Sequence, residues 1–439
     1  MRDAIAVTLN RTRSRRHPAG LYVLFFTEMW ERFSYYGMRS LLVYYMIKHL
    51  QFTQERSSEI YGLYTGFVYF TPLFGGMLAD RLLGQRKTVI VGAVLMAVGH
   101  FLMAFEGLFF PALIFLILGN GAFKPNISTQ VGALYPAGDH RRDRAFSLFY
   151  MGINLGAFFS PLVCGTLGEK IGFSWGFGAA GVGMVVGLLV YLWGQKHLAP
   201  DLIMQKKGSQ QQKSSEPMTR EDWLKIGAIF VMMALSIVFW SVYEQQGNTM
   251  ALWADANTDR MIFGWEMPAS WFQAFNPLMI FLFVPMLNVF WGRQDRRGKE
   301  PSSIAKMGIG CVLLAAAFLV LIPPARELTD NPKASLWWLT ACTFVLTIGE
   351  IYLSPIGLSL VTKIAPARIV SMMMGVWFLS SFFGNFLSGY LGTFWEKMSK
   401  EHFFLLMFAL SFTTGLAFFA LLKPLKKAIG RGNQAGADV

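Results

Sequence analysis

The stretch TEMWERFSYYGMRSLL, Thr27–Leu42, lies inside an apolar segment long enough to cross a membrane, yet it carries two acids and two bases. If it is helical, one face about 100° wide holds five of its residues: Glu28, Glu31, Arg32, Tyr35 and Arg39. A charge at mid-membrane costs at least ~2.5–3.5 kcal/mol on insertion scales. This face must therefore meet protein or a water-filled cavity. The alternative to a functional site is an ion-pair cluster that only packs helices together.

The composition indicates a membrane protein that crosses the bilayer many times. Of the 439 residues 54% are hydrophobic and only 15% are charged, and the mean hydropathy is +0.42. The three cysteines, Cys164, Cys311 and Cys342, all lie in apolar segments, so we interpret them as packing residues and expect no disulfide framework. The first apolar stretch is a full span, and we expect no cleavable signal peptide.

Apolar stretches of about 20 residues predict an all-α polytopic fold with twelve transmembrane helices. Their expected bounds are 21–48, 58–82, 88–106, 109–135, 145–169, 174–196, 223–254, 268–291, 303–324, 334–364, 369–395 and 402–423. A polar linker at 198–222 divides them into two six-helix bundles, 21–197 and 223–424. A basic N-terminus at 1–20 and a tail at 425–439 complete the expected organisation.

The distribution of Lys and Arg predicts the orientation. With twelve spans both termini lie on one side, and that side holds 28 of the 39 basic residues, against 8 on the other. This asymmetry places both termini and the linker in the cytoplasm. It also removes a nucleic-acid interpretation of the net charge of +13, because the positive charge follows the topology.

The segment GGMLADRLLGQRKT, Gly75–Thr88, lies between the second and third predicted helices. It resembles the signature loop of the major facilitator superfamily, with the form G-x-x-A-D-R-x-x-G-x-[RK]. The matching residues are Gly76, Asp80, Arg81, Gly84 and Arg86. Glycines permit close helix approach, and Asp80 and Arg81 can pair near a helix end. The loop predicts the fold and indicates conformational gating, but it says nothing about a substrate.

Three further charged residues lie within predicted spans: Lys124, Glu244 and Glu350. Together with the first helix they give four acids against three bases. This near balance predicts ion pairs between the two halves of the chain, with one acid left to bind a proton. Making and breaking such pairs is a physical way to couple protonation to opening. Isolated buried charges with a structural role are the alternative.

Several motifs together resemble the proton-coupled oligopeptide transporter family. They are ExxER followed by FSYYGMR on the first helix, the Lys-Pro-Asn of the fourth, FYMGINLG of the fifth and EQQGN of the seventh. The resemblance runs along nearly the whole chain. It implies a symporter that imports di- and tripeptides together with protons by alternating access. It also implies that the chain is not an enzyme, uses no cofactor or metal, and works as a monomer in the inner membrane, with peptide-like drugs as further substrates.

The resemblance also implies roles for individual residues. Proton coupling falls to Glu28, Glu31, Arg32 and Glu244. Substrate binding falls to Tyr35, Tyr36, Arg39, Tyr69, Lys124, Asn154, Asn276, Glu350 and Trp377, with Arg39 and Lys124 near the peptide carboxylate and Glu350 at its amino group. The implied gating pairs are Arg39–Glu244 and Lys124–Glu350. For Asn154 and Asn276, hydrogen bonding between helices is an equally good interpretation. Trp377 is the weakest assignment, because an aromatic residue on a span usually packs.

The chemistry required of a peptide site agrees with these roles. A zwitterion needs cations for its carboxylate and an anion for its ammonium, which Arg39 with Lys124 and Glu350 supply. The chain lacks the two extra helices that many bacterial members carry between their halves. It also lacks the second-helix histidine of animal members, so the proton must ride on carboxylates; His100 is interpreted as a packing residue. A carrier of another organic anion, amino-acid derivative or drug remains an alternative. An enzyme is not expected, since no H-E-x-x-H, metal cluster or Gly-x-Ser-x-Gly motif occurs.

Overall fold

A computed structural model describes residues 17–136, 139, 141–200, 218–327, 333–366 and 369–430 of the chain. Most of the predicted basic N-terminus, most of the linker at 198–222 and the end of the tail at 425–439 lie outside these ranges.

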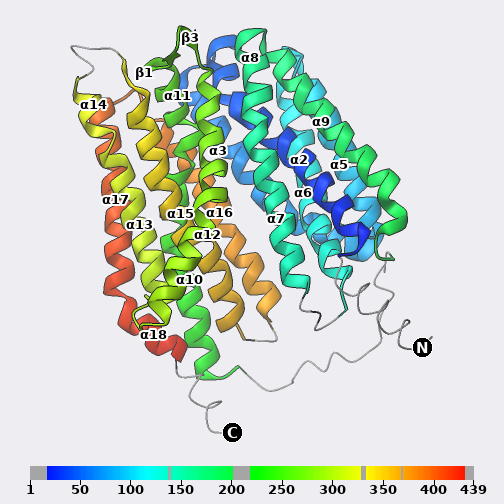
Figure 1. The fold of residues 1–439 in the computed structure, drawn as a ribbon, viewed down its shortest axis with the longest axis vertical. Coiled ribbons are helices and arrows are strands. Elements are labelled where there is room, and N and C mark those ends of the chain that lie inside the picture. Colours follow the sequence, from blue (N-terminus) through cyan, green and yellow to red (C-terminus); the bar gives the residue numbers. More distant parts are fainter. Residues whose placement is uncertain are drawn as a thin grey trace, which may run out of the picture. The chain divides into compact units, whose positions relative to one another are not determined.

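The first half of the chain is helical over each of the six segments predicted from sequence (Figure 1). Its α-helices are α2 (Ala19–Tyr44), α3 (Gln54–Phe70), α4 (Pro72–Leu78), α5 (Gln85–Leu102), α6 (Phe109–Ala133), α7 (Arg141–Ser160), α8 (Thr166–Lys170) and α9 (Phe173–Gly194). Single π-helical turns η1 (Tyr45–His49), η2 (Ala79–Leu83) and η4 (Pro161–Gly165) extend or join them, and η3 (Glu106–Leu108) and η5 (Gln195–His197) are short 3₁₀ turns. π-turns within helices occur often at functional sites.

The second half is also helical, with longer connections between several of its helices. Its helices are α10 (Arg220–Tyr243), α11 (Thr249–Ala256), α12 (Phe272–Asp295), α13 (Ser303–Leu319), α14 (Ile322–Arg326), α15 (Leu336–Ile364), α16 (Val370–Gly392), α17 (Lys400–Ala420) and α18 (Leu422–Gly430), with 3₁₀ turns η6 (Glu244–Gly247) and η7 (Ala269–Trp271). Two-residue strands occur at β1 (Thr258–Asp259), β2 (Met261–Ile262), β3 (Trp265–Glu266) and β4 (Ala334–Ser335). β1 pairs parallel to β4, and β2 pairs antiparallel to β3. The predicted all-helical fold is confirmed.

Within the described residues, eight helices are long and apolar enough to cross a membrane. α2 is not among them, because its four charged residues lower its hydropathy. The same charges that indicate a site on the first helix therefore make its span hard to identify from hydropathy alone.

The helices continue through several of their prolines. α6 continues through Pro125, α12 through Pro277 and α15 through Pro355. The long helix of the second half breaks instead at Asn248, where φ is −117° and ψ is −98°. A proline removes one helical hydrogen bond, whereas the segment before Asn248 turns its side chains toward other helices, as described below.

The chain divides into two compact units. Unit 1 contains residues 1–37, 71–160 and 177–205, and unit 2 contains 38–70, 161–176 and 206–439. Unit 2 therefore joins three first-half segment ends to the whole second half: those of the first, second and fifth predicted helices. The proposed bundles at 21–197 and 223–424 stay a prediction.

In unit 2, α13 packs against both α15 and α17, and α3 packs against α16 (Figure 1). The contact between α3 and α16 is close because Gly62 faces Gly389, where a side chain on either residue would meet the other backbone. Leu314, Phe318, Phe404 and Phe418 are among the fully buried side chains of this core. In a bilayer, small residues at such crossings permit the close packing that lipid cannot provide.

In unit 1, the signature loop packs against α6 through Gly75. A Cβ at Gly75 would meet the Gly121 carbonyl group, and Asn126 Nδ2 donates to the Gly75 carbonyl oxygen at 3.2 Å. The neighbouring Gly76, which carries the sequence match, has open space around it. Gly84 takes a φ of +78°, which favours glycine.

The charged residues of this loop have different surroundings. Arg86 donates to the carbonyl oxygens of Leu198 (2.7 Å) and Ala199 (2.6 Å) and so ties the start of α5 to the end of α9. Asp80 and Arg81 are exposed. Among the described residues no ion pair joins Asp80 to Arg81, although the sequence allows one.

The two adjacent glycines allow a sharp test of this packing. We expect Gly75→Ala to destabilise the protein by about 1–3 kcal/mol, because the added methyl group overpacks the contact with α6. Gly76→Ala should be neutral or stabilising by up to about 1 kcal/mol, because alanine is the better helix former. Thermal unfolding of both variants in detergent measures the difference, and equal melting temperatures would contradict this account of the loop.

Candidate functional site

The charged face of α2 forms a buried ion-pair cluster in unit 1. Arg32 pairs with both oxygens of Glu31, including a bond from Nη2 to Oε1 of 2.6 Å, and its Nε lies 3.4 Å from Glu28 Oε1. The side chains of Glu28, Glu31 and Arg32 are 2%, 0% and 3% exposed. The guanidinium carbon also lies 5.0 Å from the centre of the Tyr35 ring. The charged face predicted from sequence therefore meets protein rather than lipid.

The two acids of this cluster are not equivalent. Glu31 has both oxygens on the guanidinium, and Asn120 Nδ2 of α6 donates to its Oε1 at 3.3 Å. Glu28 has only the longer contact, and its Oε2 is buried without a hydrogen-bond partner among the described residues. Two carboxylates share one guanidinium here, and the positive charge of Arg32 mostly balances the charge of Glu31.

A second ion pair joins the two halves of the chain within unit 2. Arg39 of α2 pairs with Glu244 of η6, and Arg39 Nε donates to the Tyr61 hydroxyl of α3 at 2.7 Å. The side chains of Arg39 and Glu244 are 11% and 5% exposed. The structure thus brings together the first of the two implied gating pairs, and it adds Tyr61, which the sequence did not single out.

The segment that follows Glu244 contacts two other helices where the long helix breaks. Gln245 Nε2 donates to the Ser388 carbonyl oxygen of α16 at 3.0 Å, and Asn248 Oδ1 accepts from the Ser58 hydroxyl of α3 at 2.9 Å. Gly247 lies directly against the Tyr61 hydroxyl. These contacts join the broken segment to α3 and α16.

A third cluster surrounds Glu350 of α15, also in unit 2. Glu350 Oε2 accepts from the Tyr243 hydroxyl at 2.6 Å and from Asn276 Nδ2 at 2.9 Å. Asn276 also lies 3.0 Å from Thr347 Oγ1. Three helices, α10, α12 and α15, therefore fix one carboxyl group. Tyr243 was missed in the sequence, where only its position next to Glu244 could have drawn attention to it.

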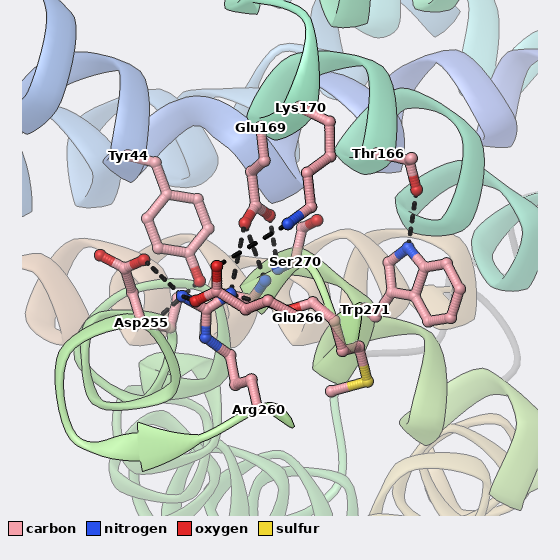
Figure 2. Close-up of polar contacts among 12 residues, drawn as sticks. Tyr44, Thr166, Glu169, Lys170, Asp255, Arg260, Glu266, Ser270 and Trp271 are labelled. Atoms are coloured by element: carbon pink, nitrogen blue, oxygen red, sulfur yellow. Dashed lines mark hydrogen bonds and ion pairs between the residues drawn. The ribbon is translucent and has the colours of Figure 1, made fainter. Parts of the chain in front are cut away.

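Six charged residues form an ion cluster around Arg260 in unit 2. Figure 2 labels all of them except Lys48. This Arg260 cluster consists of Lys48, Glu169, Lys170, Asp255, Arg260 and Glu266. The Arg260 guanidinium lies 3.0 Å from Glu266, 3.5 Å from Asp255 and 3.9 Å from Glu169, and it donates to the Met267 carbonyl oxygen at 2.6 Å. Lys48 pairs with Asp255 at 2.6 Å, and Lys170 lies 3.8 Å from Glu266. Three positive and three negative groups thus form one connected network of ion pairs.

Glu169 also binds backbone in this cluster. Its two oxygens accept from the backbone N–H groups of Ala269 and Ser270, both at 2.8 Å, at the start of η7 and α12 (Figure 2). Trp271 Nε1 donates to Thr166 Oγ1 at 2.9 Å. A carboxylate at a helix N-terminus is favoured by the unpaired N–H groups and by the helix dipole. The end of the predicted fifth helix is thereby bound to the second half of the chain. These residues lie at the end of the fifth predicted helix and at the start of the eighth, and the sequence did not single them out.

The remaining predicted site residues have varied surroundings. Asn154 donates to the Tyr150 carbonyl oxygen of its own helix at 3.0 Å, and Trp377 is 6% exposed and lies against Gly357. Tyr36, Tyr69 and Lys124 are half-buried. Lys124 belongs to unit 1 and Glu350 to unit 2, and the Lys124–Glu350 pair stays a prediction.

Comparison with known proteins identifies relatives along the whole chain. A family model described as the POT family matches residues 86–207 and 200–406. A peptide transporter of Yersinia enterocolitica is 36% identical over 86% of this chain and 88% of its own length. A di-/tripeptide transporter of Lactococcus lactis is 31% identical over 96% of this chain and 99% of its own length.

Solved structures agree with these relatives. A crystal structure of a peptide transporter, POT, with sulfate is 31% identical and has a TM-score of 0.87 over 94% of this chain and 96% of that one. A POT family transporter in complex with 5-aminolevulinic acid is 28% identical and has a TM-score of 0.84 over 93% of this chain and 97% of that one. The fold predicted from the signature loop is confirmed.

The Arg260 cluster generates a testable prediction about stability. We expect Arg260→Ala to lower the free energy of unfolding by about 1–3 kcal/mol, because it leaves three partly exposed carboxylates and the Met267 carbonyl oxygen without their shared donor. Lys397→Ala is the matched control: it removes the pair with Glu55, whose partners are 49% and 51% exposed, and should cost about 0–1 kcal/mol. Thermal unfolding in detergent measures both, and a loss for Arg260→Ala no larger than for the control would contradict a central role for this guanidinium.

Proposed function

The chain belongs to the POT family, and we propose from this premise that it is a proton-coupled symporter that imports di- and tripeptides by alternating access. The observation that carries this proposal is the Glu350 cluster, in which a half-buried carboxyl group on α15 accepts hydrogen bonds from α10 and α12. A fixed anion at this place suits the ammonium group of a peptide. The names of the Yersinia and Lactococcus relatives support the same substrate class.

The substrate has two charged ends, and the chain offers a charge for each. Tyr243 and Asn276 both donate to Glu350 Oε2, and we assign Oε1 to the peptide ammonium. Arg39 and Lys124 are assigned to the peptide carboxylate, since both carry positive charge on helices of the first half. Tyr35, Tyr36, Tyr69, Asn154, Asn276 and Trp377 complete the proposed pocket. Charge-assisted hydrogen bonds at both poles are stronger than neutral ones, which selects free peptide termini.

Protons are the proposed coupling ion, and no cofactor is required. Glu28, Glu31, Arg32 and Glu244 form the proposed coupling machinery. Glu244 holds Arg39 in an ion pair when it is charged. A proton on Glu244 removes that charge and frees Arg39 for the peptide carboxylate, so proton binding and substrate binding favour each other. The available driving force is ~2.3 kcal/mol per charge per 100 mV and ~1.36 kcal/mol per pH unit.

We assign the Arg260 cluster to an outer gate. Its members, Lys48, Glu169 and Arg260 among them, lie at the ends of predicted spans or between them. The distribution of Lys and Arg places these positions on the side of the membrane opposite the termini. This orientation places both termini in the cytoplasm and the protein in the inner membrane. Opening toward the outside then requires these ion pairs to separate. Lys124–Glu350 is the proposed partner gate, and we propose that one chain carries out the full cycle as a monomer.

A second candidate function is the transport of a small amino-acid derivative. The related POT family transporter with 5-aminolevulinic acid favours it, because that ligand also has an amino and a carboxyl group. The two charged poles described above accept either substrate class. The distance between the poles and the space between them distinguish the two classes, and competition experiments measure this directly.

Uptake into proteoliposomes tests the function. We expect labelled dialanine to accumulate only with an inward proton gradient and a negative-inside potential. Other di- and tripeptides should compete, whereas free alanine should not, because its two charges are too close to reach both poles. Efficient competition by 5-aminolevulinic acid but not by dipeptides would favour the second candidate. No uptake under a verified gradient would reject the peptide proposal.

Variants of the Glu350 cluster test the assignment of the ammonium site. We expect Glu350→Gln to weaken dialanine binding at least ~10-fold, because the charge that faces the ammonium is lost. Binding of N-acetyl-dialanine, which has no ammonium group, should change little. Tyr243→Phe removes one hydrogen bond to the carboxylate and should weaken dialanine binding about 3–10-fold.

The matched control is Tyr390→Phe on α16, whose side chain is 56% exposed and which should leave binding unchanged. Isothermal titration calorimetry in detergent measures the affinity of the unaltered protein and of each variant for dialanine and for N-acetyl-dialanine. Equal loss of dialanine and N-acetyl-dialanine binding in Glu350→Gln would show that Glu350 does not contact the peptide amino group.

A further inference from the structure

Asn120 occupies a fixed position beside the charged cluster of α2. It lies between Gly119 and Gly121, which pack closely against Met96 of α5 and Thr71 respectively. These contacts hold the α6 backbone from two sides. The Asn120 side chain is 1% exposed, and its Nδ2 donates to Glu31 Oε1 at 3.3 Å. An amide buried in a membrane helix is costly unless both of its ends are bonded.

Two hydrogen-bond acceptors of this cluster have no donor among the described residues. Asn120 Oδ1 and Glu28 Oε2 are both buried without a hydrogen-bond partner among the described residues. They belong to one connected cluster, because Asn120 bonds Glu31, Glu31 pairs with Arg32, and Arg32 pairs with Glu28. Two acceptors cannot bond each other, but a proton added to Glu28 turns its carboxyl group into a donor.

The charges around Glu28 are consistent with this single missing proton. Arg32 is its nearest cation, Glu31 is a second acid on the same helix, and Lys124 acts on it from α6, one turn beyond Asn120. Glu31 occupies the guanidinium through both oxygens, so Glu28 is the acid whose charge is less compensated.

We propose that Asn120 is a positioning residue for proton coupling, which accepts the hydrogen bond of a protonated Glu28 through Oδ1 while it holds Glu31 through Nδ2. The proton adds to the Glu28 carboxylate, gives a neutral carboxylic acid, and leaves again when the acid ionises. Asn120 thereby favours the protonated form of one acid and the ionised form of the other. This inference rests on the proposed function, since it assigns a residue to its proton step.

Two variants with opposite expected effects test the proposal. Asn120→Leu keeps the side-chain size but removes the acceptor. The external pH at half-maximal proton-driven dialanine uptake should move about one pH unit to the acidic side. Asn120→Asp adds a negative charge beside Glu28, which then holds a proton more readily, so the midpoint should move to the alkaline side. A purely structural role would not produce shifts of opposite sign.

Asn126→Leu is the matched control on the same helix. Asn126 is 3% exposed, and its Nδ2 donates to the carbonyl oxygens of Ala122 (2.7 Å) and Gly75 (3.2 Å). This variant should lower stability and leave the pH midpoint unchanged. Peptide counterflow at equal pH and zero potential checks that each variant keeps a working pocket. An unchanged midpoint in Asn120→Leu, or shifts of both Asn120 variants in the same direction, would overturn the proposal.

A measurement without transport separates this inference from the proposed function. Glu28→Gln places an amide donor where the protonated acid would carry its hydrogen. In the otherwise unaltered protein it should raise the melting temperature in detergent, and in the Asn120→Leu background the rise should disappear. Where Asn120→Leu does not fold, Asn120→Ala serves as the background, because it also removes the acceptor and the rise should disappear there too. The same effect of Glu28→Gln in the unaltered and Asn120→Leu backgrounds would refute the link even if dialanine is transported.

Discussion

One guanidinium compensating two carboxylates inside a membrane helix is the constraint on which the rest of this structure depends. Arg32 cannot neutralise both Glu28 and Glu31, and neither acid can reach water when their side chains are at most 2% exposed. A charge in this environment must be bonded by protein or neutralised by a proton. The surrounding helices meet this demand only in part: α6 supplies the amide of Asn120, and one carboxylate oxygen is left over.

The same logic organises the second half of the chain. Glu244 and Glu350 lie on different helices, and each is held by side chains from other helices: Glu244 by Arg39, and Glu350 by Tyr243 and Asn276. The regular helix gives way at Glu244–Asn248, where side chains bond to α2, α3 and α16. The ion pair and the break in the helix therefore lie in the same short segment.

The proposed outer gate depends on polar contacts of a different kind. Glu169 binds the backbone at the start of α12, and Arg260 collects three carboxylates. Backbone N–H groups and exposed rim charges such as Glu266 can be rehydrated when they separate, which an apolar seal of the same area cannot do without cost. A gate of this kind is held by several ion pairs and hydrogen bonds when closed, and its polar groups bind water when it opens.

The sequence by itself determined the twelve helical segments, the buried charged face of α2 and the family, because long apolar runs and charges within them have few physical solutions. It also predicted Arg39–Glu244 through the resemblance. Only the tertiary structure decided that Gly75 rather than Gly76 makes the close contact, that Asp80 and Arg81 do not pair, and that Tyr243, Tyr61, Asn120, Glu169 and Arg260 join the clusters. These residues act through partners far away in the sequence. Which side chains meet depends on how helices cross, and local periodicity carries no information about that crossing.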